Sequence, residues 1–272
     1  AEDNTFLMAG DLNQTVRKKS RRGDVPWKKI AGVTLDFTGR VKYIRKNYRN
    51  SKQIGLYLCH MLQHMNERMK MLNLIDFKEL EYDSFEVGET KSLALNVKTG
   101  IGRMDITKKT VDAIKEIAEK YKLSYSEIAV LFPYKQHDRI RYYNLYWLRQ
   151  ALDAEDIPYS MITSSRDGIF ERKRYSDTNG VVLSTIDSSL GLDFKAVIVT
   201  GLYPYNYIYG DDFYKKEISS WNTIKGMNDD DQLQVQSQMR AIYTACSRAR
   251  DVLYVLSDLK PGSPMEEILK NR

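Results

Sequence analysis

The chain has 272 residues, enough to bury a sizeable core in one or two domains. It carries 42 Lys and Arg against 36 Asp and Glu, a formal charge of +6, which mildly favours a polyanionic partner. No apolar run reaches the roughly 18 residues of a membrane span, and no signal peptide precedes the first predicted strand, so we expect a soluble, intracellular protein. Cys59 and Cys246 form no metal or redox spacing, which predicts a cytoplasmic protein without a disulfide-linked partner.

The first predicted elements are a short strand and a long helix. Phe6–Ala9 is an apolar run that ends in a polar turn reaching Gln14. The basic run Arg17–Arg22 is expected to be exposed. From Ser51, placed as an N-cap, apolar residues recur at helical spacing as far as Met69. This spacing predicts a long helix with one buried face.

Strands alternate with helices through the middle of the chain. Strands are predicted at Ser92–Val97 and Ile128–Phe132, and helices at Val111–Tyr121 and Tyr143–Leu152. The run Ile128–Phe132 is continuously apolar and is bounded by Pro133. Such a run is typical of a strand buried on both faces of a sheet.

The same alternation continues to the end of the chain. Two strands, Val181–Leu183 and Ala196–Thr200, enclose a polar turn, and a helix from about Gln232 to Arg248 precedes the strand Val252–Leu256. Residues 203–231 are rich in Tyr, Asn and Asp without a clear period, which predicts an irregular insertion. The whole pattern predicts an α/β fold with a mainly parallel sheet covered by helices on both faces.

Four polar segments follow or precede these elements. They are Gly10-Asp11-Leu12-Asn13-Gln14, Asn47-Tyr48-Arg49-Asn50, the turn from Thr185 to Phe194, and the run from Tyr243 to Arg250. Taken in order, they resemble motifs III, IV, V and VI of superfamily I DNA helicases of the UvrD/Rep type. Those motifs typically read G-D-x-x-Q, N-Y-R-S, T-x-x-x-K-G-L-E-F and Y-x-A-x-T-R-A-R. The four matches stand in the family's order over nearly the whole chain.

The resemblance implies a RecA-like fold and a division into two parts. Residues 1–30 would be the tail of a first motor domain, and residues 31–272 a second motor domain with an irregular insertion at about 203–231. Larger relatives insert a subdomain between the segment ending at Tyr159 and motif V. Only a short stretch separates Tyr159 from Val181 here, so that subdomain is expected to be missing or vestigial. The chain opens without Met, as expected for a piece of a longer protein.

By the same resemblance, five residues would contact ATP. Arg49 and Arg248 would reach the γ-phosphate, for which the planar, permanently charged guanidinium is well suited. Tyr48 would stack on adenine. Gly191 would let the backbone approach the nucleotide, and Asp193 would bind the ribose where the family has Glu.

Each of these residues also has a plainer interpretation. Without the resemblance, Arg248 is a solvated helix end and Tyr48 a tyrosine at the edge of the core. Asp193 is then a loop aspartate that caps its own backbone. Gln14 matches the family glutamine that senses the γ-phosphate, but it is equally typical of a solvated turn.

A second group of residues is expected to contact nucleic acid. Arg17 and Lys19 stand where the family has base-stacking aromatics, so they contact the phosphate backbone or belong to an ordinary solvated loop. Lys135 follows a buried strand whose end faces the single strand in relatives. Thr185 and Ser188 can donate hydrogen bonds to phosphate oxygens. Together they predict a single-stranded DNA track.

Motif V departs from the family on its nucleic-acid side. Asp187 stands where a strand-contacting His is common, and Leu190 where Lys is common. Because a carboxylate facing phosphates is unfavourable, these residues favour an alternative, a non-catalytic helicase-like module that binds nucleic acid or protein. A dinucleotide-binding Rossmann enzyme is excluded, since no Gly-rich loop follows the first strand.

The chain contains no G-x-x-x-x-G-K-[ST] phosphate loop, and no paired acidic motif for Mg²⁺ precedes its first strand. We therefore expect ATP hydrolysis with Mg²⁺ only in an intact helicase, with the first motor domain in cis. The 272-residue chain alone is expected to hold no cofactor tightly and to be inactive. Three histidines, His60, His64 and His137, form no recognisable metal site.

Overall fold

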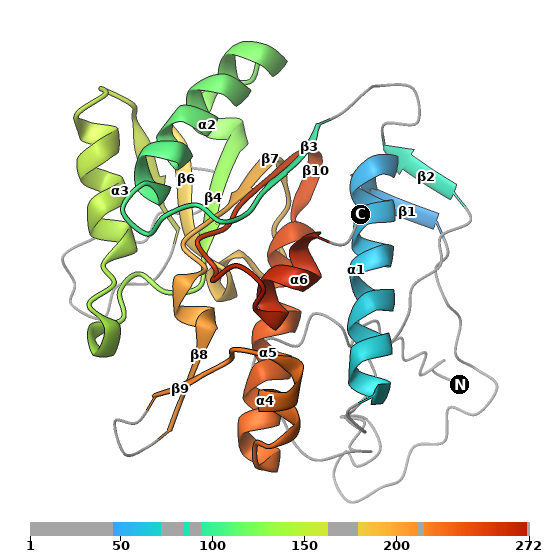
Figure 1. The fold of residues 1–272 in the computed structure, drawn as a ribbon. Helices are drawn as coiled ribbons and strands as arrows, with labels where there is room; N and C mark the ends of the chain where they lie inside the picture. The colour runs from blue at the N-terminus through green and yellow to red at the C-terminus, as the bar shows by residue number, and fades with distance from the viewer. Residues whose placement is uncertain (1–45, 72–83, 88–93, 163–178, 211–214, 271–272) are drawn as a thin grey trace, which may run out of the picture.

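The computed structural model describes residues 46–71, 84–87, 94–162, 179–210 and 215–270. Figure 1 shows the arrangement of the helices and strands. The predicted strand Phe6–Ala9 and the candidate residues Gln14, Arg17 and Lys19 lie outside the described residues. None of the described helices is long and apolar enough to span a membrane.

A six-stranded sheet forms the centre of the fold, with the strand order β3-β10-β7-β4-β6-β5. Every neighbouring pair in this sheet is parallel. The strands are β3 (Leu95–Lys98), β4 (Ile128–Phe132), β5 (Tyr159–Met161), β6 (Val181–Thr185), β7 (Phe194–Val199) and β10 (Ala249–Leu256).

Helices cover both faces of the sheet, as Figure 1 shows. One face packs against α1 (Lys52–Met71), α4 (Trp221–Lys225), α5 (Asp229–Cys246) and α6 (Pro264–Lys270). The other face packs against α2 (Ile106–Tyr121) and α3 (Asn144–Asp153).

The central strand β4 shows why the sheet is buried on both sides. Ala129 and Leu131 belong to the cluster that contains α1 and α5, whereas Ile128, Val130 and Phe132 belong to the cluster that contains α2 and α3. Successive side chains of a strand point to opposite faces, so a fully apolar strand serves two cores at once. The predicted α/β class with a parallel sheet covered on both faces is confirmed, and it agrees with a RecA-like arrangement.

The segment before α1 differs from the prediction. It forms strand β1 (Lys46–Ser51), which pairs in parallel with β2 (Ser84–Val87) in a separate two-stranded sheet. Ser51 ends β1, and the helix begins at Lys52. The polar sequence of β1 has no apolar alternation, so nothing in its pattern indicated a strand.

Residues 203–231 also contain more structure than the predicted irregular insertion. A 3₁₀ turn η6 (Tyr203–Asn206) leads into an antiparallel pair, β8 (Tyr207–Tyr209) and β9 (Lys215–Glu217), followed by α4. The next helix, α5, begins after the N-cap Asn228, whose Oδ1 accepts the Asp231 N–H at 2.8 Å. It ends at Cys246, so Arg248 lies beyond the helix and not on its last turn as predicted.

Candidate functional site

Three segments that are far apart in the sequence meet at the amino ends of β7 and β10. They are β1, the loop that carries Gly191 and Asp193, and the junction between α5 and β10 that carries Arg248. We call this place the arginine site. It is held together by hydrogen bonds from side-chain amides and a guanidinium to backbone carbonyls.

Asn50 joins β1 to the junction on either side of Arg248. Its Nδ2 donates to the backbone oxygens of Ser247 at 3.1 Å and Ala249 at 2.6 Å. Asn47 supports it from within β1, donating through Nδ2 to Asn50 Oδ1 at 3.1 Å and accepting the Asn50 N–H at 2.8 Å. Both asparagines are buried. They therefore hold the segment that carries Tyr48 and Arg49 against the backbone on either side of Arg248.

Arg248 is only 1% exposed, and its side chain is bonded within the domain. Nε donates to the Thr244 carbonyl at 3.2 Å, Nη1 to the Leu192 carbonyl at 3.2 Å and Nη2 to Ser247 Oγ at 2.9 Å. Its own carbonyl accepts the Phe194 N–H at 3.0 Å. Because buried charge is tolerated only where its donors are satisfied, this residue is a structural link as well as a candidate catalytic group.

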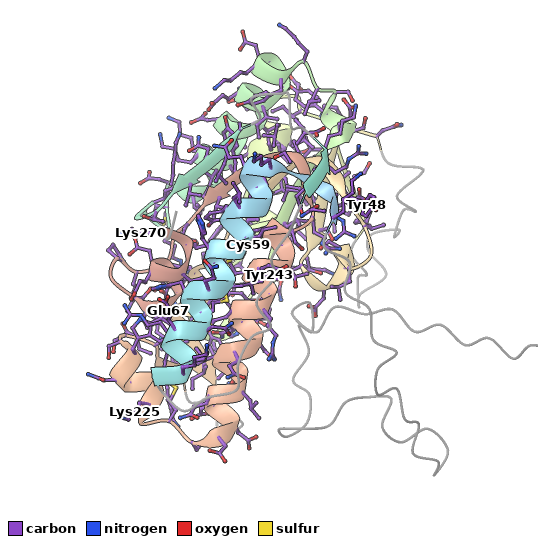
Figure 2. All side chains as sticks on the ribbon, turned by 90° about the vertical axis from the view of Figure 1, so that its right-hand side faces the viewer. Tyr48, Cys59, Glu67, Lys225, Tyr243 and Lys270 are labelled. Atoms are coloured by element: carbon purple, nitrogen blue, oxygen red, sulfur yellow. The ribbon has the colours of Figure 1, made fainter. Side chains whose placement is uncertain are left out.

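Tyr48 and Arg49 are the accessible part of the arginine site. The Tyr48 ring is 62% exposed, and Lys46 Nζ lies 5.3 Å from its centroid. Figure 2 shows Tyr48 at the edge of the molecule, beyond the first turn of α1. Arg49 is half-buried, and its guanidinium has no hydrogen-bond or ion-pair partner among the described residues. These two side chains are placed to meet a ligand from solvent, whereas Arg248 is turned inward.

The loop before β7 brings the remaining nucleotide candidates to the same place. Gly191 has φ +84°, and a Cβ there would meet no atom within 4 Å. The left-handed backbone is by itself a reason for glycine at this position, and no protein atom crowds it. Asp193 is exposed directly before β7.

The nucleic-acid candidates lie at the opposite edge of the sheet, at the carboxyl ends of β4 and β6. Phe132 pairs with Thr185 there, and Lys135 follows on the loop after β4. Thr185 Oγ1 donates to Ser188 Oγ at 2.9 Å, and the Ser188 N–H approaches Thr185 Oγ1 at 3.3 Å. The structure thus brings these three candidates to one edge, although the two hydroxyls bond to each other.

Asp187 adds negative charge at this second edge. It is exposed, while burial raises the pKa of the Tyr134 hydroxyl to about 12, with a smaller contribution from the Asp187 charge. A phosphate ligand here would therefore face a carboxylate as well as Lys135.

Metal and thiol chemistry find no support in the described parts of the chain. No group of three or more His, Cys, Asp or Glu side chains is placed to hold a metal ion there. His64 Nε2 lies 3.1 Å from Glu267. Cys246 is buried, and burial raises the pKa of its thiol to about 12, so it stays protonated near neutral pH.

Sequence reasoning missed Asn47 and Asn50 as site residues. The spacing of two asparagines around a Tyr-Arg pair was the available signal, because asparagine side chains readily bond to backbone groups two or three residues away. The sequence could not predict the other acceptors of the Asn50 amide, because the Ser247 and Ala249 carbonyls lie almost 200 residues further along the chain.

Comparisons with known proteins add structural likenesses only. No protein-family model and no curated protein matches the chain. The structure is similar to the C-terminal domain of a possible DNA helicase from Lactobacillus plantarum WCFS1, with 17% identity over 82% of this chain and 92% of that one and a TM-score of 0.41. It is also similar to the C-terminal part of the Fun30 ATPase domain, with 14% identity over 64% of this chain and 46% of that one and a TM-score of 0.29. At these scores neither likeness carries an argument about function.

Proposed function

We propose that this chain is the second motor domain of an ATP-dependent superfamily I helicase of the UvrD/Rep type. In this proposal it supplies Arg49, Arg248 and Tyr48 to an ATP site shared with a first motor domain in cis, and part of a single-stranded DNA track. The observation that carries the proposal is the meeting of three motif-bearing segments at Arg248, with Asn50 bonded to the carbonyls on both sides of it.

The residues of the arginine site fit a nucleotide. The exposed ring of Tyr48 offers a stacking surface. No described residue accepts a hydrogen bond from the Arg49 guanidinium, so its N–H groups can donate to a ligand. The exposed carboxylate of Asp193 can accept hydrogen bonds from ribose hydroxyls. When bound, ATP with Mg²⁺ would supply the phosphoryl group, and the chain's own contribution would be positive charge placed around it.

Arg248 would have to turn outward to join this ligand. The turn would exchange three hydrogen bonds to neutral acceptors for hydrogen bonds to phosphate oxygens, in which donor and acceptor are both charged. Asn50 would hold the backbone on either side while the side chain moves. Closing and opening of the cleft between motor domains would then be coupled to the position of Arg248.

Steady-state ATPase kinetics of the intact protein test this proposal. Arg49→Ala should lower kcat by roughly 10³-fold or more with little change in KM, because the guanidinium would stabilise charge that develops in the transition state. Lys52→Ala is the matched control, since it removes an exposed positive charge three residues away. Equal kinetics for the parent, the Arg49 variant and the control would contradict the proposal. The 272-residue chain alone should show no ATPase with or without single-stranded DNA.

A second candidate function is a helicase-like binding module without catalysis. The deep burial of Arg248 favours it, because three internal hydrogen bonds already account for its guanidinium. In that case the intact protein would show no ATP hydrolysis above background, and Arg248→Ala would act on the stability of the domain alone.

A further inference from the structure

Arg250 is a second arginine at the junction between α5 and β10, and its surroundings differ from those of Arg248. Its side chain is exposed, whereas Arg248 is buried. No described residue forms a hydrogen bond or an ion pair with the Arg250 guanidinium. Only Ala249, which is fully buried, separates the two arginines. Arg250 therefore keeps its donors available to a ligand, beside an arginine whose nitrogens already donate within the domain.

A hydrogen bond and a strand pair fix the position of the Arg250 backbone. Asn50 Nδ2 donates to the Ala249 carbonyl at 2.6 Å, so the peptide unit that links Ala249 to Arg250 is bonded directly to β1. Ala249 also pairs with Phe194, the first residue of β7. Arg49 and Arg250 therefore each lie one residue away from the same hydrogen bond. Consecutive Cα atoms are about 3.8 Å apart, so both guanidinium groups can reach one polyphosphate.

The charges near Arg250 leave it available to an anion. Lys195 follows Phe194 in β7, and its Nζ already bonds to Glu127. Asp193 and Asp251 are carboxylates of the same segments, and neither forms an ion pair with Arg250 within the described parts of the chain. In the proposed site Asp193 would contact the ribose and not the phosphates. The phosphates would then be left to the arginines.

A nucleoside triphosphate brings several negative charges before any bond breaks. Arg248 cannot meet them while its guanidinium donates to the Thr244 and Leu192 carbonyls. Among the described arginines of this site, Arg49 and Arg250 are the two with available donors. Contacts made before the reaction lower Kd and KM, whereas contacts made only in the transition state raise kcat. The two arginines that flank Ala249 are thus placed for different steps.

We propose that Arg250 binds the phosphates of the nucleotide in the ground state, while Arg248 is still turned inward. This inference rests on the proposed function, because it assigns a further residue to that ATP site. The N–H groups of the guanidinium would donate to phosphate oxygens, with both partners charged. Asn50 would hold the backbones of β1 and β10 together as the ligand binds. Loss of Arg250 should then weaken binding without slowing hydrolysis of the bound nucleotide.

Isothermal titration calorimetry of the intact protein with the non-hydrolysable analogue AMP-PNP and Mg²⁺, together with steady-state ATPase kinetics, tests the inference. Arg250→Gln should raise the Kd for AMP-PNP and the KM for ATP by about tenfold, as expected for the loss of a hydrogen bond between charged groups. Its kcat should stay within about twofold of the parent. Arg250→Lys keeps the charge but loses the planar fork, so its Kd should lie between those of the parent and Arg250→Gln.

Lys195→Gln is the matched control. It removes an exposed positive charge from the residue after Phe194, and this charge is already bonded to Glu127. Its Kd and KM should stay within about twofold of the parent. A tenfold rise in the control as well would show that the general positive field, and not a contact from Arg250, binds the nucleotide. That result would overturn the inference.

Three further results would also overturn it. Unchanged Kd and KM in Arg250→Gln, with kcat still lowered by Arg49→Ala, would reject the role of Arg250 and leave the proposed function standing. A lowered kcat with an unchanged Kd in Arg250→Gln would assign Arg250 to the transition state instead. Parent-like values for both variants would reject the ATP site itself. Thermal unfolding separates loss of binding from loss of fold, and the exposed Arg250 should tolerate both substitutions with little change in Tm.

Discussion

The two edges of the parallel sheet hold their arginines in opposite ways. At the amino edge, Arg248 is buried and each guanidinium nitrogen donates to an acceptor inside the domain. At the carboxyl edge, Arg103 and Arg139 lie over tyrosine rings, where they remain half-exposed or exposed. Removing Arg248 should therefore lower the stability of the domain, whereas removing the exposed Arg139 should change that stability little.

The largest expected effect on stability comes from Arg248→Ala. Truncation removes the donor to the part-buried Leu192 carbonyl and one of two donors to the Thr244 carbonyl, which still accepts from Ser247 Oγ, and it opens a cavity. The free energy of unfolding should therefore fall by roughly 2–4 kcal/mol. Arg139→Ala, at the other edge, should change it by less than about 0.5 kcal/mol. Urea unfolding of both variants measures the difference. Equal free energies of unfolding for Arg248→Ala and Arg139→Ala would contradict the claim that the two edges hold their arginines differently.

The next largest effect is expected for Asn50→Asp. The change replaces a buried amide that donates to Ser247 and Ala249 with a carboxylate oxygen facing the same two carbonyls. We expect a loss of roughly 2–3 kcal/mol in the free energy of unfolding. Asn50→Ser, whose shorter neutral side chain can reach at most one carbonyl, should lose less. If the two variants were equally stable, the amide bridge would not be what joins β1 to β10.

The carboxyl edge should also respond to pH through Asp258. Burial raises the pKa of this carboxyl to about 6, while the Tyr142 hydroxyl and the Tyr203 N–H donate to its oxygens. A raised pKa of a carboxyl means that its stabilising contribution is complete below its unfolded pKa of 3.8 and is lost as the pH rises through about 6. Relative to Asp258→Asn, the parent should lose roughly 2–3 kcal/mol of unfolding free energy across that window.

Comparing the parent with Asp258→Asn separates the pH dependence due to Asp258 from that of other carboxyl groups. Burial opposes the ionisation of Glu266 and Glu267, but side-chain hydrogen bonds, from Lys270 and Trp221 respectively, help to outweigh it, and the pKa of each is lowered. These two residues add stability as the pH rises, the opposite sign, in parent and variant alike. A difference between parent and Asp258→Asn that does not change with pH would contradict the assignment.

The smallest effect is expected for Gly191→Ala. The left-handed backbone, φ +84°, disfavours any residue with a Cβ, but no atom lies within 4 Å of that Cβ. The free energy of unfolding should fall by only about 1 kcal/mol. A decrease several times larger would contradict the open surroundings of this position in the structure.

Much of the fold could be predicted because its elements carry their own patterns. The apolar run of β4 and the helical spacing of α1 and α2 indicated the elements that form the core. Two elements had no such pattern. Strand β1 is held by the amide of Asn50, which bonds to carbonyls beside Arg248. Strand β8 pairs with β9, and it also contacts His137 through Tyr209 and accepts from Gln238 at the Tyr207 carbonyl, so both elements depend on partners distant in the sequence.

The sequence could indicate which residues are candidates, but not how deeply each is buried or which groups it bonds to. The resemblance pointed to Arg49 and Arg248 alike, yet one guanidinium lacks a partner in the described residues and the other is buried with three acceptors. Burial depends on the packing of α5, β7 and β10, which no local pattern specifies. The tyrosines of residues 203–209 show no period for the same reason, since Tyr203 stacks on Tyr142 and Tyr209 on His137, both far away in the sequence.

The central claim is that β1 and the α5–β10 junction bring two arginines to one ligand. A double-mutant cycle on kcat for ATP hydrolysis by the intact protein, with Arg49→Ala, Arg248→Ala and the pair, tests it most directly. The claim predicts a large loss of kcat for each single variant and a pair that is clearly less impaired than the product of the two losses, a coupling of roughly 1 kcal/mol or more. Two losses that simply multiply, or kcat values within about twofold of the parent, would contradict it.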